Sequence, residues 1–337
     1  ESKINKAYDV IQKARKPKAA LKELLNSSSD IVSHEISQTV EGLRLHLSKL
    51  PSFDRSDNDN GNFIDELIKL PVGAPTLICG LPSHGKTTLM LNVLVRQLLE
   101  GQEVVFFTYE EPRSKLVVKI INCLRSIWAG GDTPQGQQGA PFIQRAIKSN
   151  TYQNNSFLNY CIERVYKWLD TESLIIVDKT LSDDDLTDTI RLIENPEAIV
   201  YIDYIQKIPS KAEARIATVS NKLQALCKDL NMCFVIGAQF NREGSNNSKP
   251  EIHNLKGASE LEQDAALVLR IYRPNQEEEG RQVTALKNRG GTIGYNHNFY
   301  FDGLGTYMTP EENPKAYTCP IDVNKEFNEI LETNTPF

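Results

Sequence analysis

Short apolar runs alternate with longer amphipathic stretches through the middle of the chain. The runs are rich in β-branched and aromatic residues, which is typical of buried strands, and they read TLICG, EVVFFT, LIIVD, AIVYID, CFVIGA and LVLRIY. Segments of helical periodicity lie between them, such as RSKLVVKIINCLRSI at 113–127 and ATVSNKLQALCKDL at 217–230. Strands that alternate with helices in this way predict an α/β fold, with helices flanking a mainly parallel twisted sheet.

The chain before residue 63 departs from this pattern. Residues 1–50 are predicted to be helical, and an N-cap sequence SSSD precedes one apolar stripe, formed by Ile36, Val40, Leu43 and Leu47. The stripe buries against either its own domain or a neighbouring subunit, and the sequence leaves both open. Residues 51–62 form a polar linker, 129–141 a loop and 313–337 a polar tail by composition. Because the chain starts at Glu1 and not at Met, we expect a fragment of a longer protein.

Composition and charge exclude some classes of protein but identify no partner. Hydrophobic residues make up 40% and charged residues 24% of the chain, as in ordinary globular proteins. We find neither an apolar run long enough for a membrane nor a secretory leader. We therefore expect no membrane contact and no secretion, and a place in the cytoplasm of a bacterium, a phage-infected cell or a plasmid host, or in an organellar matrix. The six cysteines lack CxxC spacing and are expected to be buried thiols. The net charge of −6 is compatible with a local groove for nucleic acid.

The first apolar run leads into a glycine-bounded turn, GLPSHGKT, which fits the pattern GxxxxGK(S/T). Its two glycines allow the backbone to curl around a phosphate, and the next helix adds the positive end of its dipole. Lys86 is expected to reach the β- and γ-phosphates, and Thr87 to hold Mg²⁺. We interpret His84 as a variable position of the loop and not as a catalyst. The predicted phosphate contacts are Gly80, Ser83, His84, Gly85, Lys86, Thr87 and Thr88.

Three further apolar runs end in polar residues suited to the same site. AIVYID ends in Asp203, a carboxylate at the edge of a parallel sheet where ligands gather, so we expect it to hold the metal together with Thr87. EVVFFT is followed by Glu110 and Glu111, one of which could act as a general base toward water, and Glu110 is nearer the strand end. CFVIGA is followed by Gln239, whose amide could hydrogen-bond the γ-phosphate or the water.

Together these residues resemble the RecA-like ATPase domain of the DnaB-type hexameric replicative helicases, which also occurs in phage and mitochondrial primase–helicases. The similarity runs from about residue 61 to residue 308 and includes GNFIDEL, the phosphate loop, FTYEEPRSKL, IDYIQ, AQFNRE, LEQDAALVLRIYR and LKNRGGTIG. IDYIQ and the last two segments are the specific ones. The resemblance implies a RecA-like P-loop domain over 63–312, ATP and Mg²⁺ as cofactors, and Glu110 as the catalytic carboxylate. It also implies that residues 1–50 are linker helices that dock on the adjacent subunit of a ring.

The resemblance assigns roles to segments with weak signals of their own. In LKNRGGTIG, Lys287 and Arg289 would insert into the neighbouring subunit's ATP site, Arg289 as the arginine finger. DNA in the channel of the ring would meet the loops KIPSKAEARIATV and NREGSNNSKPEIHNLKGAS. In the second loop, Lys256, Gly257 and Ser259 match a segment that grips the phosphate backbone, although KGAS replaces an Arg-Glu-Ser-Gly type run. The candidates in the first loop rest on charge alone and are Lys207, Lys211 and Arg215.

The function implied by the resemblance is that of a homo-hexameric ring motor powered by ATP. It would move 5′→3′ on single-stranded DNA and unwind forked duplex DNA, with a primase and a helicase loader as further partners. The alternative is a RecA/RadA-like recombinase or a regulatory ATPase, in which ATP switches DNA binding without processive unwinding. LEQDA and the hairpin with Lys287 and Arg289 favour the helicase. A silent scaffold is disfavoured because all the expected site residues are present.

Overall fold

The computed structural model describes residues 70–128, 139–240, 249–255, 258–274, 280–291, 293–294, 296–301 and 308–310. The predicted helical segment 1–50, the linker 51–62 and the tail 313–337 lie outside the described residues. Most of the predicted ATPase domain lies within them.

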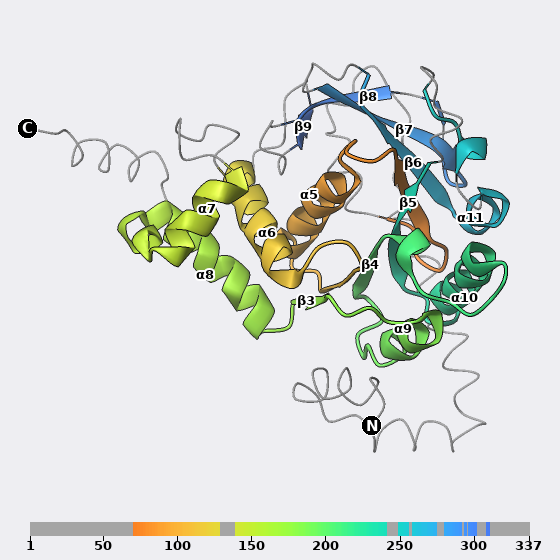
Figure 1. Cartoon of the computed structure of the whole chain (residues 1–337), viewed down its shortest axis with the longest axis horizontal. Coiled ribbons are helices and arrows are strands. Elements are labelled where there is room, and N and C mark those ends of the chain that lie inside the picture. The colour runs from red at the N-terminus through yellow and green to blue at the C-terminus, as the bar shows by residue number, and fades with distance from the viewer. Residues whose placement is uncertain are drawn as a thin grey trace, which may run out of the picture.

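The strands in these ranges form one nine-stranded sheet in the order β3-β2-β4-β5-β1-β6-β7-β8-β9 (Figure 1). From β3 to β6 in this order, neighbouring strands are parallel. The remaining strands add antiparallel pairs at one side. The parallel strands are β1 (Thr76–Gly80), β2 (Val104–Thr108), β3 (Leu174–Val177), β4 (Ile199–Asp203), β5 (Cys233–Gln239) and β6 (Leu267–Tyr272). They coincide with the six apolar runs, so the predicted mainly parallel α/β fold is confirmed.

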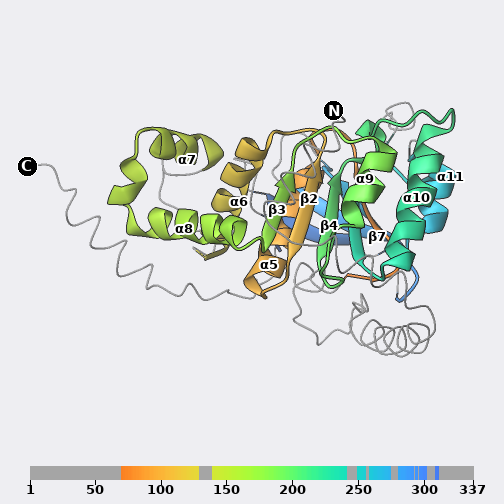
Figure 2. The same ribbon diagram turned by 90° about the horizontal axis from the view of Figure 1, so that it is seen from below.

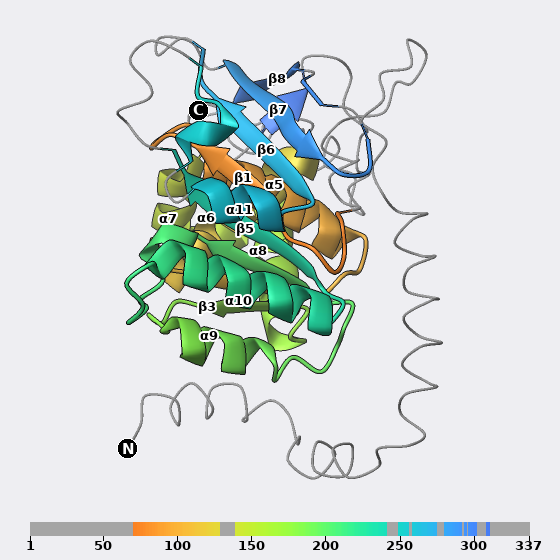
Figure 3. The ribbon, with the colours of Figure 1, turned by 90° about the vertical axis from the view of Figure 1, so that its right-hand side faces the viewer.

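Helices cover both faces of the sheet (Figures 2 and 3). One face carries α5 (Lys86–Leu99) and α6 (Arg113–Trp128), and the other carries α9 (Asp183–Ile190), α10 (Arg215–Asp229) and α11 (Ala258–Asp264). Beyond α6, at the β3 edge, lie α7 (Gly139–Lys148), η1 (Thr151–Asn154) and α8 (Ser156–Asp170). Two short 3₁₀ turns, η2 (Ile205–Lys207) and η3 (Ile252–Asn254), complete the described helical elements. None of these helices has the length and apolarity needed to cross a bilayer.

Alternate residues of each parallel strand face opposite helical layers. On β1, Ile78 packs in the layer of α5 and α6, whereas Leu77 and Cys79 pack in the layer of α9 and α10. Strands buried on both faces read as continuous apolar runs, which explains the pattern of the sequence. Each fully buried Leu, Ile or Phe contributes about 1.5–3 kcal/mol through removal of apolar surface from water. Two such layers hold the strands, and therefore the polar residues at the strand ends, in fixed positions.

Two parts of the fold differ from the expected pattern. The antiparallel strands β7 (Gly280–Asn288), β8 (Asn296–Phe301) and β9 (Met308–Pro310) mix polar and apolar residues or are very short, so no apolar run indicated them. The prediction of a loop over 129–141 is wrong for its last three residues, because α7 begins at Gly139. Pro141 lies in the first turn of α7, where a missing N–H costs no intrahelical hydrogen bond.

Candidate nucleotide-binding site

The turn between β1 and α5 has the backbone shape of an anion-binding loop. Ser83 and Gly85 are both left-handed, with φ of 64° and 101°, and α5 begins directly afterwards at Lys86. Left-handed residues in a tight turn can direct successive N–H groups to one side, where the helix dipole also favours negative charge. Gly80 is needed for space: a Cβ there would lie 2.9 Å from Ile271 Cγ2 and 3.0 Å from Lys86 Cγ. The loop therefore closes tightly on its own lysine.

Thr87 and Asp203 meet beneath this loop. The Thr87 hydroxyl Oγ1 donates a hydrogen bond of 2.6 Å to Asp203 Oδ2. Asp203 is the last residue of β4 and is 1% exposed. Burial raises the pKa of its carboxyl group, while the Thr87 hydrogen bond and the Lys86 charge lower that pKa. Its second oxygen, Oδ1, is buried and has no hydrogen-bond partner within the described part of the chain. A hydroxyl beside a buried carboxylate with a free oxygen fits a hard divalent cation such as Mg²⁺.

Gly237 on β5 makes room for this carboxylate. A Cβ at position 237 would lie 3.1 Å from Asp203 Oδ1 and 3.2 Å from Tyr204 Cβ. Gly237 was not among the predicted site residues. The glycine inside the apolar run CFVIGA was the available signal, since glycine within a strand often marks a close approach of other atoms.

Lys86 is buried beside an aromatic ring and feels the charges of two carboxylates. Its side chain is 8% exposed, and its Nζ lies 5.1 Å from the centroid of the Tyr204 ring. Burial lowers the pKa of Lys86, and the charges of Asp203 and Glu110 raise it. A buried cation above a left-handed loop is suited to receive phosphate oxygens.

The structure distinguishes the two glutamates after β2. Glu111 Oε2 forms an ion pair of 2.7 Å with Lys119 Nζ on α6. Glu110 Oε1 lies 4.0 Å from Lys207 Nζ, and both of these side chains are partly exposed to solvent, at 45% and 40%. The turn itself is fixed, because the N–H groups of Glu110 and Glu111 donate to Thr108 Oγ1 at 3.4 and 3.1 Å. Glu111 is therefore committed to a structural pair, which supports the choice of Glu110 as the catalytic carboxylate.

Gln239 is held by a side chain that was not predicted. Gln206 Nε2 donates to the Gln239 carbonyl at 3.2 Å, and the Gln239 N–H donates to Gln206 Oε1 at 3.1 Å. Gln206 is 9% exposed and lies in η2, which begins two residues after Asp203. The polar residue at the end of IDYIQ was the available signal, because a buried amide needs hydrogen-bond partners.

Strand order brings the predicted residues to one edge of the sheet. The strands β2, β4, β5 and β1 are consecutive neighbours, with Thr108 opposite Asp203 and Gly80 opposite Gln239. The polar residues that follow these strands therefore share the carboxyl edge, where open α/β sheets bind ligands. The residues brought together in this way are Glu110, Asp203, Gln239, Lys86 and Thr87.

His84 connects the phosphate loop to the ribbon of β6 and β7. Its Nδ1 accepts the Arg273 N–H at 3.1 Å, and its carbonyl accepts Arg281 Nε at 3.2 Å. The His84 and Tyr272 ring centroids lie 5.6 Å apart. Burial and the nearby charges of Arg281, Arg273 and Lys86 lower the pKa of the imidazole to about 4. A neutral imidazole in these contacts braces the loop, and the absence of a catalytic role for His84 stays a prediction.

Lys287 and Arg289 lie at the opposite edge of the sheet. Lys287 Nζ donates to the carbonyls of Glu262 and Gln263, the latter at 3.3 Å, and Arg289 Nη2 donates to the Gln263 carbonyl at 2.5 Å. These carbonyls belong to the last turn of α11, where cations are favoured. Burial and the charge of Arg289 lower the pKa of Lys287.

The distance from Arg289 to its own phosphate loop follows from the register. The Arg289 N–H donates to the Ala266 carbonyl, and the Ala266 N–H donates to the Pro75 carbonyl. Arg289 is therefore level with Pro75, five residues before Gly80, or about 16 Å along the strands and about 10 Å across two of them. One arginine side chain does not span this distance.

The predicted DNA-contacting residues are described only in part. Lys211 and Arg215 are exposed after η2, and Lys207 lies beside Glu110. Lys256 and Gly257 lie outside the described residues. Ser259 is in α11, but its side chain is outside what the structure describes. These DNA contacts stay predictions.

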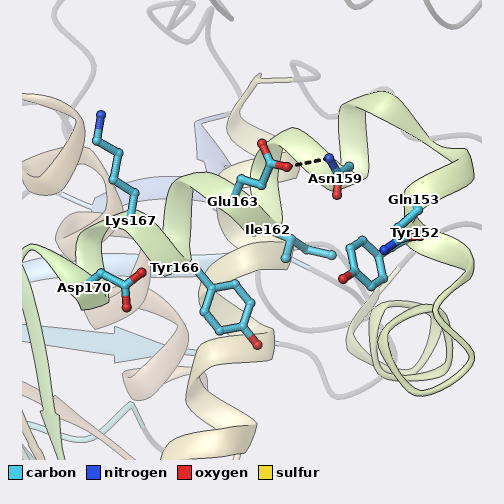
Figure 4. Close-up of a pocket in the computed structure, with 8 residues that line it drawn as sticks. All are labelled: Tyr152, Gln153, Asn159, Ile162, Glu163, Tyr166, Lys167 and Asp170. Carbon is cyan, nitrogen blue, oxygen red and sulfur yellow. Dashed lines mark hydrogen bonds between the residues drawn. The ribbon is translucent and has the colours of Figure 1, made fainter.

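A pocket of about 600 Å³ opens elsewhere, on α8 and η1 (Figure 4). Tyr166 in its lining is 47% exposed, and Asn159 Nδ2 donates to Glu163 Oε1 at 2.8 Å. Its lining residues lie between 152 and 170 and include none of the strand-end residues. This pocket is thus separate from the nucleotide site.

Comparison with known families identifies the domain. Residues 70–307 match the family described as DnaB-like helicase C terminal domain, which covers the phosphate loop, all four strand ends and the Arg289 hairpin. The chain belongs to this family. The predicted resemblance is thereby confirmed.

Several relatives support this assignment at low identity. The Replicative DNA helicase DnaB of Helicobacter pylori is 23% identical over 285 residues, which are 80% of this chain and 53% of that protein. A Probable plasmid replicative DNA helicase of Chlamydia trachomatis is 26% identical over 250 residues, 72% of this chain and 52% of that protein. The chain thus spans about half the length of the curated relatives it matches.

Two solved structures share the fold. A structure of an ATPase domain aligns with a TM-score of 0.62 at 20% identity, covering 84% of this chain and 98% of that one. A DnaB-like replicative helicase, solved in a study of its interactions with primase, aligns with a TM-score of 0.63 at 20% identity, covering 90% of this chain and 75% of that one. The site described above therefore lies in a RecA-like fold of the DnaB-like type.

Proposed function

We propose that this DnaB-like protein is an ATP-dependent replicative DNA helicase whose subunits form a homo-hexameric ring. The observation that carries the proposal is the division of the site between two edges of the sheet. Lys86, Glu110, Asp203 and Gln239 share one edge, while Arg289 is held at the other by α11. An arginine finger accelerates phosphoryl transfer by about 10³–10⁵, so a complete site requires a second subunit.

ATP and Mg²⁺ fit the residues of the first edge. Thr87 and Asp203 would hold the cation, with the buried Asp203 Oδ1 as the available oxygen. The loop N–H groups and Lys86 would hold the phosphates. Bound Mg²⁺ would neutralise charge on the phosphate oxygens.

The remaining residues would position water and report on the γ-phosphate. Glu110 would orient the attacking water and take its proton, as a general base contributes about 10²–10⁴ in rate. Gln239 would donate an amide hydrogen bond at the same point. Lys287 and Arg289 would arrive from the adjacent subunit and stabilise the charge that develops in the transition state.

Single-stranded DNA is the proposed track of the motor, inside the ring. Lys211 and Arg215 are exposed on the segment that follows η2, and sequence-independent binding needs only cations and amides that follow the phosphate backbone. Lys207, Lys256, Gly257 and Ser259 complete the proposed contacts. We expect a primase and a loader as further partners, and a cytoplasmic place of action. The proposed domain limits remain 63–312, with residues 1–50 as docking helices.

Strand displacement on forked DNA tests this function. The substrates carry a single-stranded tail on either the 5′ or the 3′ side, and the protein is supplied with ATP and Mg²⁺. We expect unwinding of the fork that permits 5′→3′ movement, together with a hexamer by light scattering. ATP hydrolysis and DNA binding without unwinding of either fork would favour the alternative, a recombinase-like or regulatory ATPase.

A further inference from the structure

The turn η2 connects three parts of the molecule that the proposed function treats separately. It follows Asp203 at the metal-holding end of β4, contacts the end of β5 through Gln206, and leads into the segment with Lys211. Ile205 and Ile208 on either side are buried at 1% and 0% exposure. The turn is therefore anchored in the core, and Gln206 is its buried polar side chain.

The contact between Gln206 and Gln239 uses both halves of the amide. Nε2 donates to the Gln239 carbonyl and Oε1 accepts the Gln239 N–H. Two antiparallel hydrogen bonds to one residue fix its backbone in position and in rotation, as a further strand would. The Gln239 side chain starts from this backbone, which Gln206 helps to position together with the pairing to Gly80 on β1.

The same residue is tied to the start of α10. Arg215 Nη2 donates to the Gln206 carbonyl at 3.1 Å, and Arg215 is the first residue of α10. The segment 208–214 between them is part of the first predicted DNA loop, KIPSKAEARIATV. Gln206 thus lies between the end of β5, where the γ-phosphate would be sensed, and the base of a loop that would contact DNA.

We propose that Gln206 is a positioning residue that transmits the state of the DNA loop to Gln239. Movement of the loop or of Arg215 changes the hydrogen bond to the Gln206 carbonyl, and with it the orientation of the side-chain amide that holds Gln239. The inference rests on the proposed function, because it assumes hydrolysis that responds to DNA. It adds a route from the DNA loop to the site, carried by one buried side chain.

Two variants of the full chain test this role through steady-state ATP hydrolysis with and without single-stranded DNA. Gln206→Ala removes both hydrogen bonds. We expect the DNA-stimulated kcat to fall about tenfold to a hundredfold, as for a displaced catalytic group, with KM for ATP changed less than about twofold. The ratio of stimulated to basal rate falls toward one. The matched control is Gln153→Ala, an exposed glutamine on η1, which should keep the wild-type ratio.

Gln206→Glu keeps the shape of the side chain but affects the two hydrogen bonds to Gln239 differently. The introduced carboxylate still accepts the Gln239 N–H, but it donates to the Gln239 carbonyl only when protonated. We expect low stimulation at pH 8 and recovery, relative to the wild type, as the pH is lowered. The charged or titratable groups close by are Arg215, Lys207, Asp203 and Glu110, so the pH profile is compared with that of the wild type under the same conditions.

The outcomes separate the inference from the proposed function. If the wild type unwinds neither fork, the proposed function fails. If it unwinds one fork but DNA does not stimulate its hydrolysis of ATP, the inference alone fails. If the wild type is stimulated and both folded variants keep its kcat and ratio at every pH, Gln206 has no positioning role. Equal losses of basal and stimulated rates together with a lower melting temperature would also overturn the inference, since they indicate a purely structural residue.

Discussion

The two edges of the sheet hold their charged groups in different ways. At the carboxyl edge, Asp203 and Lys86 are buried and pre-set, with the Thr87 hydroxyl 2.6 Å from the Asp203 carboxylate. At the opposite edge, Arg289 is exposed and donates to a backbone carbonyl of α11. A hydrogen bond from arginine to a phosphate oxygen joins two charged groups and is stronger than one from arginine to a neutral carbonyl. The first edge is built to receive a ligand in place, and the second can give up its contacts when a better acceptor comes near.

The largest effect is expected where the two edges must meet. Arg289→Ala should lower the kcat for ATP by about 10³–10⁵, because the transition state loses its cation from the adjacent subunit. Binding of a fluorescent ATP analogue should remain close to that of the wild type, since Arg289 is distant from its own phosphate loop. Lys86→Ala should remove hydrolysis through loss of phosphate binding.

Mixing these two inactive proteins sharpens the comparison. Where an Arg289→Ala subunit supplies the phosphate loop and a Lys86→Ala subunit supplies the finger, the interface is complete. Random mixing in equal amounts gives roughly a quarter of such interfaces in a cyclic ring, so ATP hydrolysis should reappear. A mixture as inactive as its components would place the finger within its own subunit or give it another role.

A second prediction compares neighbours at the carboxyl edge. Glu110→Gln should lower kcat by about 10²–10⁴, because water loses its base. Glu111→Gln removes the pair with Lys119 and a minor effect of the Glu111 charge on Asp203, and a partly exposed ion pair contributes about 0–1 kcal/mol. Its kcat should therefore stay within about twofold of the wild type. The opposite order of the two effects, in single-turnover hydrolysis, would assign the base to Glu111.

The smallest expected effect is on the pH dependence of stability, and it involves only the carboxyl edge, through His84. The imidazole of His84 has a pKa of about 4 in the folded chain against an ordinary value of 6.5. Between these values the unfolded chain binds the proton and the folded chain does not, so stability falls as the pH drops from 6.5 toward 4. His84→Asn keeps an acceptor for the Arg273 N–H without this titration. Melting temperatures from pH 7.5 to pH 5 should decline less steeply in the variant, and parallel curves would remove His84 as a source of pH dependence.

The parallel half of the sheet was predictable because its apolar runs have one structural meaning. Runs such as LVLRIY are too short for helices and too apolar for loops, and each became a strand. The sequence also predicted, from spacing and from position at a strand end, that the turn 80–87 and Asp203 belong to one site, and the structure places Thr87 beside Asp203. The antiparallel strand GRQVTALKN could not be predicted from hydrophobicity, because charged residues interrupt it. These residues are Arg281 and Lys287, and in the fold they bond to the phosphate loop and to α11.

Other parts of the site depend on contacts between distant segments. Neither the strand order nor the pairing of Glu111 with Lys119 can be read from residue types, because both arise when the layers pack. The same holds for Gln206 and Gln239, which lie 33 residues apart. The segment IDYIQ contains Gln206, but nothing in it indicates that Gln239 is the partner.

The buried thiols make the protein suitable for labelling at a single chosen position. The five cysteines in the described ranges are Cys79, Cys123, Cys161, Cys227 and Cys233, and all are buried. Burial raises the pKa of Cys123 and of Cys227 to about 12, and the thiolate is the form that reacts with maleimides. With Cys319→Ser, a thiol introduced by Gly290→Cys beside Arg289 would carry the only fast-reacting label. If the proposed ring forms, a fluorophore there would follow the docking of one subunit on the next during each round of hydrolysis.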